Sequence, residues 1–428
     1  MSNEQRQNFY GKIPDFWHDL YESEYALFDV KKENEETIHR IRTATERITR
    51  IFYKTSSLLR QLDDKTLLQL GFPDATLHFI RFKNISPESI IARLDLVVTK
   101  DEIKLLEFNS DTPTFIKECF YVNEYVCRHW QLLNPNAGME KQLAQAIREA
   151  VKQSLSSLDY VPNGKVVFTS HNDHEEDYLT TKYLLEISGL EAEFIPLHEL
   201  KLVDEDVVRN GEMVIPRGLY TPDNERIDVL YRQTYPLEYL IHDKDSISGS
   251  RVGELLLQLV IQRQLSIVNP PSSFLLQSKA IMSLIWGLHE EGHPFYSDEE
   301  HCWIRQYFLP TYLDEEPFRN SHTAYVKKPS FGREGDSVSI YQADGSLMHE
   351  DVHKSYVSEL AVYQQYFNLP QLDIHTEKGI ERASIMYGSF VINGKPSAIG
   401  IRAGSQIMNN ASYYLPVAIC EQGENHSE

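Results

Sequence analysis

The sequence has few cysteines and no long hydrophobic run. Its 428 residues include 4 Cys, and these show no CxxC or Cys/His spacing, which argues against a disulfide framework or a zinc site and favours a reducing compartment. The longest apolar stretches, such as residues 280–288, are too short to span a bilayer, and residues 1–10 are polar without the apolar core of a signal peptide. We therefore expect a soluble, cytoplasmic protein.

Positive charge is also scarce. The chain has 42 Lys plus Arg against 63 Asp plus Glu, a formal net charge of −21. Because phosphate backbones and anionic lipids bind clustered cations, this balance argues against a nucleic-acid or membrane partner and is compatible with a cationic small molecule. The sequence further lacks the HExxH, GxSxG, GxGxxG and GxxxxGK[ST] motifs, so the familiar hydrolase and nucleotide-loop signatures are absent.

The composition, with 41% hydrophobic and 25% charged residues, is that of a globular protein, and the length predicts two or three lobes. Hydrophobic periodicity, turn residues and helix stop signals predict the main elements. In the first half of the chain we expect a long amphipathic helix at 35–62, a hairpin at 90–98 and 103–109, and a βαβ unit at 166–169, 173–188 and 192–197. In the second half we expect a helix at 277–290, a strand at 324–328, and a second hairpin at 384–392 and 397–402 around Asn393-Gly394.

The first hairpin carries charges on one face. Side chains alternate along a strand, so a three-residue loop would place Asp95 opposite Glu107 and Arg93 opposite Asn109. Facing carboxylates repel and need a compensating charge, and a set of oxygen ligands from Asp95, Glu107 and Asn109 suits Mg²⁺. The alternative is that Arg93 neutralises one of the two carboxylates and that the face is merely solvated.

A second candidate site is the segment Tyr325–Gly335. A strand delivers Lys328 to a loop that contains Gly332, Arg333 and Gly335. Glycines let backbone N–H groups approach phosphate oxygens, and Lys and Arg supply positive charge, although an ordinary surface hairpin explains the same pattern. Three further residues are weaker candidates: Lys279 early in a helix, and the amides of Gln364 and Gln365.

Glu175 and Glu176 begin the helix of the βαβ unit. Acidic residues in a first helical turn commonly serve the helix dipole, which is the default interpretation here. The second interpretation is that they hold a substrate ammonium group.

Together, several fragments resemble the synthetase domain of the glutathionylspermidine synthase family, whose members are ATP-grasp ligases similar to eukaryotic-type glutathione synthetase. The resemblance covers nearly the whole chain and rests on Ala92–Asp95, Leu106–Thr114, Lys279, Tyr325–Gly335, Tyr363–Gln365 and Gly400–Gly404. It implies an α/β fold with α+β lobes of ATP-grasp, glutathione synthetase-like type and an additional βαβ substrate lobe. The resemblance further implies three parts of the chain. Residues 1–160 would form N-terminal helices and the metal-binding hairpin, residues 161–270 the substrate-binding lobe, and residues 271–428 the ATP-binding lobes with the loop that covers the phosphates.

The resemblance also implies residue roles. Asp95, Glu107 and Asn109 would bind magnesium; Lys279, Lys328, Gly332, Gly335, Gln364 and Gln365 would contact ATP; Arg93, Arg333 and Arg402 would serve catalysis; and Thr112, Thr114, Glu175 and Glu176 would line the substrate site. Two departures from the family matter. Only about ninety residues precede the hairpin, too few for the cysteine amidase of bifunctional members, so we expect amide synthesis without amide hydrolysis. Thr112 and Thr114 stand where serines are familiar.

These observations predict an ATP-dependent carboxylate–amine ligase that works through an acyl phosphate and joins a peptide or amino acid to a polyamine-like amine. A carboxylate cannot expel oxide when an amine attacks it, and phosphorylation splits this difficult reaction into two easier steps. Two alternatives stay open: a non-catalytic nucleotide- or polyamine-binding protein, and a magnesium-dependent kinase that stops at the phosphorylated acid. The identity of both substrates and the oligomeric state, with a homodimer among the options, are not defined by the sequence.

Overall fold

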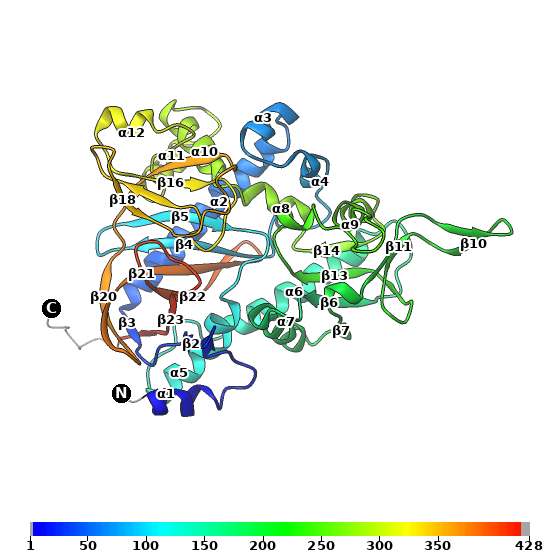
Figure 1. The fold of residues 1–428 in the computed structure, drawn as a ribbon, viewed down its shortest axis with the longest axis horizontal. Helices are drawn as coiled ribbons and strands as arrows, with labels where there is room; N and C mark the ends of the chain where they lie inside the picture. Colours follow the sequence, from blue (N-terminus) through cyan, green and yellow to red (C-terminus); the bar gives the residue numbers. More distant parts are fainter. Residues whose placement is uncertain (1–2, 421–428) are drawn as a thin grey trace.

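The computed structural model describes residues 3–420 and combines three larger sheets with surrounding helices (Figure 1). Within these residues no helix is both long and apolar enough to cross a membrane. The predicted tail after Cys420 lies outside the described residues.

An antiparallel central sheet joins segments that are far apart in the sequence. Its strand order is β23-β22-β21-β4-β5, with β20 paired to β21. The bounds are β4 Ile91–Val98, β5 Ile103–Asn109, β20 Gln371–Thr376, β21 Gly379–Ile392, β22 Lys395–Gly404 and β23 Tyr413–Leu415. Both predicted hairpins are confirmed, and Asn393 and Gly394 take the positive φ values of 50° and 74° that a tight hairpin turn requires.

The long helix predicted at 35–62 is confirmed as α2, Glu35–Leu59. The side chain of Asn34 caps its first turn by accepting a hydrogen bond from the Thr37 backbone N–H at 2.7 Å. Its apolar stripe, which includes Ile41, Ile48 and Phe52, is fully buried and packs on β21 and β22. The helix therefore covers one face of the central sheet, the face of Ser389, whose hydroxyl contacts that of Thr45 on α2. Arg93 and Asp95 alternate with Leu94 and belong to the opposite face.

The predicted βαβ unit is confirmed within a four-stranded parallel sheet of order β14-β13-β6-β7. Its strands are β6 Val166–Ser170, β7 Ala192–Phe194, β13 Val229–Gln233 and β14 Ser266–Val268. Helices α6 Met139–Ser156 and α7 Glu175–Ser188 pack on it, and α7 ends at Gly189, whose φ of 60° gives a left-handed cap. Beside this sheet lie α9 Val252–Ile261, β8 Lys201–Val203, β11 Gly218–Tyr220, β12 Arg226–Ile227 and the projecting hairpin β9 Val207–Arg209 and β10 Glu212–Ile215 (Figure 1).

The third sheet is antiparallel, with the order β15-β19-β16-β17-β18. Its strands are β15 Thr311–Tyr312, β16 Tyr325–Pro329, β17 Ser339–Tyr341, β18 Leu347–Glu350 and β19 Ala361–Gln365. The strand predicted at 324–328 is β16, and the helix predicted at 277–290 is α10, Ala280–Glu290, preceded by the 3₁₀ helix η4 at Pro271–Leu276. Helices α11 Asp298–Tyr307 and α12 Glu316–Ser321 complete this part of the molecule.

Short elements connect these parts. They are α1 Asn3–Tyr10, β1 Asp19–Leu20, β2 Ser23–Glu24, β3 Lys31–Glu33, α3 Asp64–Gln69, η1 Asp74–Thr76, α4 Leu77–Ile80, the π-helical turn η2 Glu118–Val122, α5 Asn123–His129, η3 Leu197–Glu199, α8 Leu237–Leu240 and β24 Val417–Ile419. The three sequence segments 1–160, 161–270 and 271–428 stay a prediction, because β4 and β5 of the first share one sheet with β20–β23 of the third.

Candidate functional site

The charged face of the β4–β5 hairpin has the register expected from its sequence. Asp95 lies opposite Glu107, and Arg93 lies opposite Asn109. Arg93 donates two hydrogen bonds to the Asp95 carboxylate, at 2.7 and 3.0 Å. The Asn109 amide nitrogen lies 3.2 Å from Asp95 Oδ2 and 3.0 Å from Glu107 Oε1, so three oxygen-bearing side chains converge on one point.

Two lysines, Lys279 just before α10 and Lys328 on β16, act on the Glu107 carboxylate. Lys279 lies with Nζ 3.2 Å from Glu107 Oε2 and donates to the Gly332 carbonyl at 2.9 Å. Lys328 on β16 donates to Gln364 Oε1 at 2.7 Å. Burial raises the pKa of Glu107, but the two lysines outweigh burial and hold that pKa at about 2, whereas burial lowers the pKa of Lys328 to about 8. A nearby anionic ligand would raise the pKa of Lys328 back toward its ordinary value.

The loop after β16 folds over these lysines. Gly335 has a φ of 75°, and a Cβ built there would lie 2.6 Å from the Met408 carbonyl oxygen, so glycine is required. Arg333 lies in the same loop and lines the cavity. Burial lowers the pKa of Arg333, but Glu334 and Asp177 raise it above its ordinary value, so this guanidinium stays charged.

Acidic side chains gather at the other end of the cavity. Glu176 lines this end, and burial, followed by the charges of Glu118 and Asp177, raises its pKa to about 8. Glu118 is fully buried and accepts a 2.5 Å hydrogen bond from the hydroxyl of Tyr25. Arg402 also lines the cavity, and its positive charge acts on Glu118 and Glu176 and, after that of Arg93, on Asp95.

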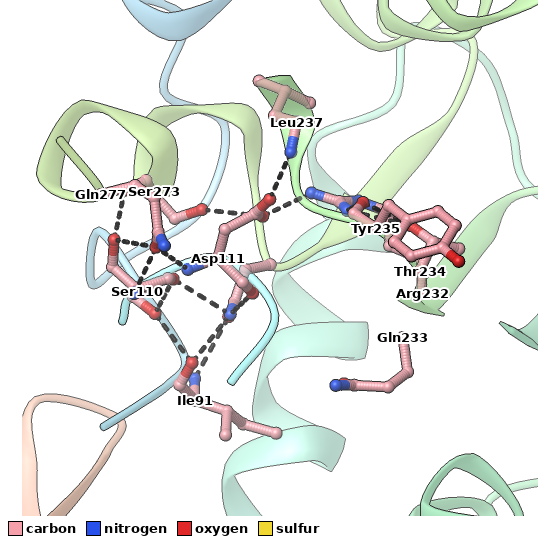
Figure 2. A network of polar contacts seen from close by, with 12 residues as sticks. Ile91, Ser110, Asp111, Arg232, Gln233, Thr234, Tyr235, Leu237, Ser273 and Gln277 are labelled. Carbon is pink, nitrogen blue, oxygen red and sulfur yellow. Dashed lines mark hydrogen bonds and ion pairs between the residues drawn. The ribbon is translucent and has the colours of Figure 1, made fainter. Parts of the chain in front are cut away.

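The segment after β5 links the two ends and carries Thr112 and Thr114. The Thr114 carbonyl accepts from Arg93 Nη1 at 2.8 Å, and the buried Thr112 hydroxyl has no hydrogen-bond partner among the described residues. Figure 2 shows how this segment is fixed: the Asp111 carboxylate accepts from Arg232 and, at 2.9 Å, from the Leu237 backbone N–H. Asp111 and Arg232 are both at most 1% exposed, so this buried ion pair connects the parallel sheet to the segment that follows the β4–β5 hairpin.

One cavity therefore brings together nearly all the residues predicted from the sequence. It is lined by Arg93, Asp95, Glu107, Asn109, Thr112, Thr114, Glu176, Lys279, Lys328, Gly332, Arg333, Gly335, Gln364, Gln365 and Arg402. The exception is Glu175, which is exposed in the first turn of α7 and does not line the cavity. Adjacent helical residues point about 100° apart, and here Glu176 faces the cavity while Glu175 faces solvent.

Sequence reasoning missed Tyr25, Glu118 and Glu238. Glu238 on α8 has a carboxylate oxygen without a partner among the described residues, and burial, followed by the charge of Asp111, raises its pKa to about 7. Neither glutamate belongs to a recognisable motif. The only local signal was that Glu118 follows the Thr112-Pro113-Thr114 segment closely in the chain.

The donor set fits a hard cation. No group of three or more His, Cys, Asp or Glu side chains within residues 3–420 could hold a metal ion, but Asp95 and Glu107 are joined by the amide of Asn109, whose oxygen is an equally suitable ligand. The Asn109 amide nitrogen now occupies the point between the carboxylates, and rotation of the amide would turn its oxygen toward the same point. Arg93 also neutralises Asp95, as the alternative interpretation of the sequence predicted.

Comparison with a solved structure places the fold in a class. The glutathione synthetase-like effector of Globodera pallida superposes with a TM-score of 0.56 at 11% identity, over 92% of this chain and 90% of that one. The fold is therefore glutathione synthetase-like, of the ATP-grasp type. At this identity the likeness concerns the fold alone.

The family assignment follows from the sequence match. Residues 6–420 match the family described as glutathionylspermidine synthase preATP-grasp, and the chain belongs to that family. A Haemophilus influenzae protein named "Putative acid--amine ligase" is 24% identical over 336 residues, which cover 76% of this chain and 74% of that protein.

Proposed function

We propose that this protein is an ATP-dependent carboxylate–amine ligase that forms an amide through an acyl phosphate. The observation that carries the proposal is the single cavity, lined also by Arg93 and Arg402, in which a cationic, glycine-containing end meets an acidic end. The family and the ligase name of the Haemophilus influenzae relative support the same reaction class.

At the cationic end the chain would bind ATP and orient its γ-phosphoryl group. Lys279, Lys328 and Arg333 supply the positive charge that a transferring phosphoryl group needs, and the loop at Gly332–Gly335 covers it. Asp95, Glu107 and Asn109 would hold Mg²⁺, which would neutralise the negative charge that develops during phosphoryl transfer. Gln364 and Gln365 offer amide groups to the nucleotide.

At the junction, Arg93 and Arg402 would hold the acid so that its carboxylate meets the phosphoryl group. Thr112 and Thr114 lie on the rigid segment beside them, and the unpartnered Thr112 hydroxyl is available to a substrate. Glu176 would bind the ammonium group of the amine by charge. A polyamine is the proposed amine class, because the local carboxylates Glu118, Glu176 and Asp177 outnumber Arg402.

The test is ADP release measured with Mg²⁺ and ATP across a panel that combines glutathione, shorter peptides and amino acids with spermidine and other amines. We expect release that requires both an acid and an amine. Release with the acid alone would instead support a kinase that stops at the phosphorylated acid. Binding of ATP or spermidine without release on any pair would support the non-catalytic alternative and contradict the proposal.

The metal assignment makes its own prediction. Mg²⁺ with ATP should raise the thermal unfolding temperature more than ATP with a chelator, since a ligand at a hundredfold excess over its Kd stabilises the native state by about 2.7 kcal/mol. Glu107→Gln should remove this difference. Asp101→Asn, in the exposed turn of the same hairpin, is the matched control and should keep it. Equal shifts with and without metal in the unmodified protein would contradict the assignment.

The amine assignment predicts a change in KM. Glu176→Gln removes a charged hydrogen-bond acceptor, so KM for spermidine should rise roughly ten- to a hundredfold with little change in KM for ATP. Because the pKa of Glu176 is about 8, its carboxylate becomes charged as pH rises through that value, and KM for spermidine should fall between pH 7 and pH 9.

The control for this prediction is Glu175→Gln, the exposed neighbour on the same helical turn. It should leave both KM values and their pH dependence unchanged. If Glu175→Gln and Glu176→Gln behave alike, Glu176 does not hold the amine.

A further inference from the structure

Glu118 does not itself line the cavity, and the proposed function uses only its negative charge. Glu118 begins the π-helical turn η2 and is 0% exposed. Its Oε1 accepts from the Tyr25 hydroxyl, and its Oε2 has no hydrogen-bond partner among the described residues. A buried carboxylate with an unused oxygen is costly to keep, and π-turns occur frequently at functional sites. Both features point to a role for Glu118 beyond packing.

Tyr25 connects Glu118 to the cavity. It lines the cavity, and its hydroxyl proton is engaged by Glu118 at 2.5 Å. A hydroxyl has one proton, so the Tyr25 oxygen can only accept a hydrogen bond from a ligand. Burial, followed by the charges of Glu118 and Glu176, raises the pKa of Tyr25 well above its ordinary value, so the phenol keeps its proton. Tyr25 thus presents an acceptor that suits the N–H of an ammonium group.

The charges around Glu118 allow it to take up a proton. Tyr25, Arg402 and Lys117 are the neighbours that act on its carboxylate, while the Tyr414 hydroxyl donates to its backbone carbonyl at 3.1 Å. Burial raises the pKa of Glu118 despite these neighbours. A second acid, Glu176, stands close enough for the charge of Glu118 to raise its pKa as well. The negative charge of ionised Glu118 therefore favours the protonated form of Glu176.

We propose that Tyr25 and Glu118 form a proton relay that accepts the proton the amine must lose before it attacks. The inference rests on the proposed ligase function. An N–H bond of the ammonium breaks as its proton passes to the Tyr25 oxygen, and the Tyr25 hydroxyl proton passes to Glu118 Oε1. The nitrogen keeps the electron pair and forms the new C–N bond. The second amine proton leaves with the departing phosphate, and Glu118 ends as an uncharged acid.

The test compares two acceptors with glutathione as the acid. Spermidine reaches the site as an ammonium ion, because an alkyl amine has a pKa near about 10.4. Hydroxylamine is uncharged at neutral pH and reacts with an acyl phosphate to give a hydroxamate without prior loss of a proton. General base catalysis is typically worth roughly 100-fold or more, so Tyr25→Phe and Glu118→Gln should lower kcat with spermidine by roughly 100-fold and lower hydroxamate formation far less.

Two further readouts separate a relay from a structural role. In Tyr25→Phe and Glu118→Gln, the rate of amide formation with spermidine should increase as the pH is raised toward the pKa of the free amine. Without the relay, only amine that is already deprotonated in solution can react. Tyr160→Phe is the matched control, since Tyr160 also donates to a carboxylate, Asp228, at 2.5 Å but lies outside the cavity. It should leave both reactions and the pH profile unchanged.

Three outcomes would overturn the relay. Equal losses with both acceptors would show that Tyr25 and Glu118 only maintain the structure, and unimpaired spermidine turnover in Tyr25→Phe would show that no proton passes through the phenol. If the Glu118→Gln variant does not fold, the Tyr25→Phe variant alone tests the relay, because this substitution removes only the hydroxyl group. A wild-type protein that makes neither amide nor hydroxamate would instead contradict the proposed function, and the relay with it.

Discussion

Replacing Lys328 by methionine is expected to lower turnover by roughly 100- to 1,000-fold, the usual cost of losing one preorganised contact to charge that develops in a transition state. Lys328 is 9% exposed and points from β16 toward Glu107 and Gln364 inside the cavity. Methionine keeps the length and the apolar contacts of the side chain. The loss should therefore appear in kcat and in the affinity for ATP, with little change in folding.

The neighbouring residue supplies the control. Lys327 lies next to Lys328 on the same strand but is exposed, because successive side chains point to opposite faces. Lys327→Met removes the same charge from the outer face and should leave turnover unchanged. The measurement is steady-state ADP release for both variants, and similar rates in the two would contradict the assignment of Lys328 to the phosphate site.

The second large effect concerns stability. Asp111→Asn should lower the free energy of unfolding by about 3–5 kcal/mol, because it leaves the charge of Arg232 buried without its partner. Arg232 Nη1 also donates to the Thr234 hydroxyl at 3.2 Å and to the Tyr235 carbonyl at 3.4 Å, but both acceptors are uncharged and cannot replace the charge of the carboxylate. The asparagine keeps the shape of the side chain, so the change reports the lost charge and not a cavity. As Figure 2 shows, the same carboxylate fixes the segment that carries Thr112.

A surface ion pair serves as the comparison. Arg382 and Asp373 lie 3.0 Å apart with side chains 59% and 62% exposed. Asp373→Asn should cost at most about 1 kcal/mol, because solvent screens such pairs. Denaturant unfolding of both variants measures the difference. If Asp111→Asn costs no more than Asp373→Asn, the buried pair does not stabilise the junction between the parallel sheet and the hairpin.

The parts of the site that lie on helices and strands could be predicted from the sequence, because they depend on interactions between residues close together in the chain. The register of Asp95 against Glu107 follows from the alternation of side chains and a short loop, and the structure has that register. The same holds for the amphipathic α2 and for the Asn393-Gly394 turn. In each case the residues that decide the structure lie within a few positions of one another.

The parts of the fold and of the site that the sequence did not predict depend on contacts between residues far apart in the chain. The sequence does not indicate that β4 pairs with β21, whose residues lie almost 300 positions away, and this pairing is what makes β4 a buried strand. Tyr25 and Glu118 are separated by 93 residues, and neither stands in a motif. Glu175 and Glu176 were indistinguishable because only the packing of α7 determines which of two adjacent residues faces the cavity. The roles of the cavity residues remain predictions.

The central claim is that the cavity joins an acid to an amine, and mass spectrometry of the products tests it most directly. With Mg²⁺ and ATP, a productive pair such as glutathione and spermidine should yield an amide lighter than the sum of its acid and amine by one water, together with equal amounts of ADP and phosphate. ATP consumption without such an amide for any polyamine or diamine would contradict the polyamine assignment, and the absence of any amide with every acid and amine tested would contradict the ligase itself.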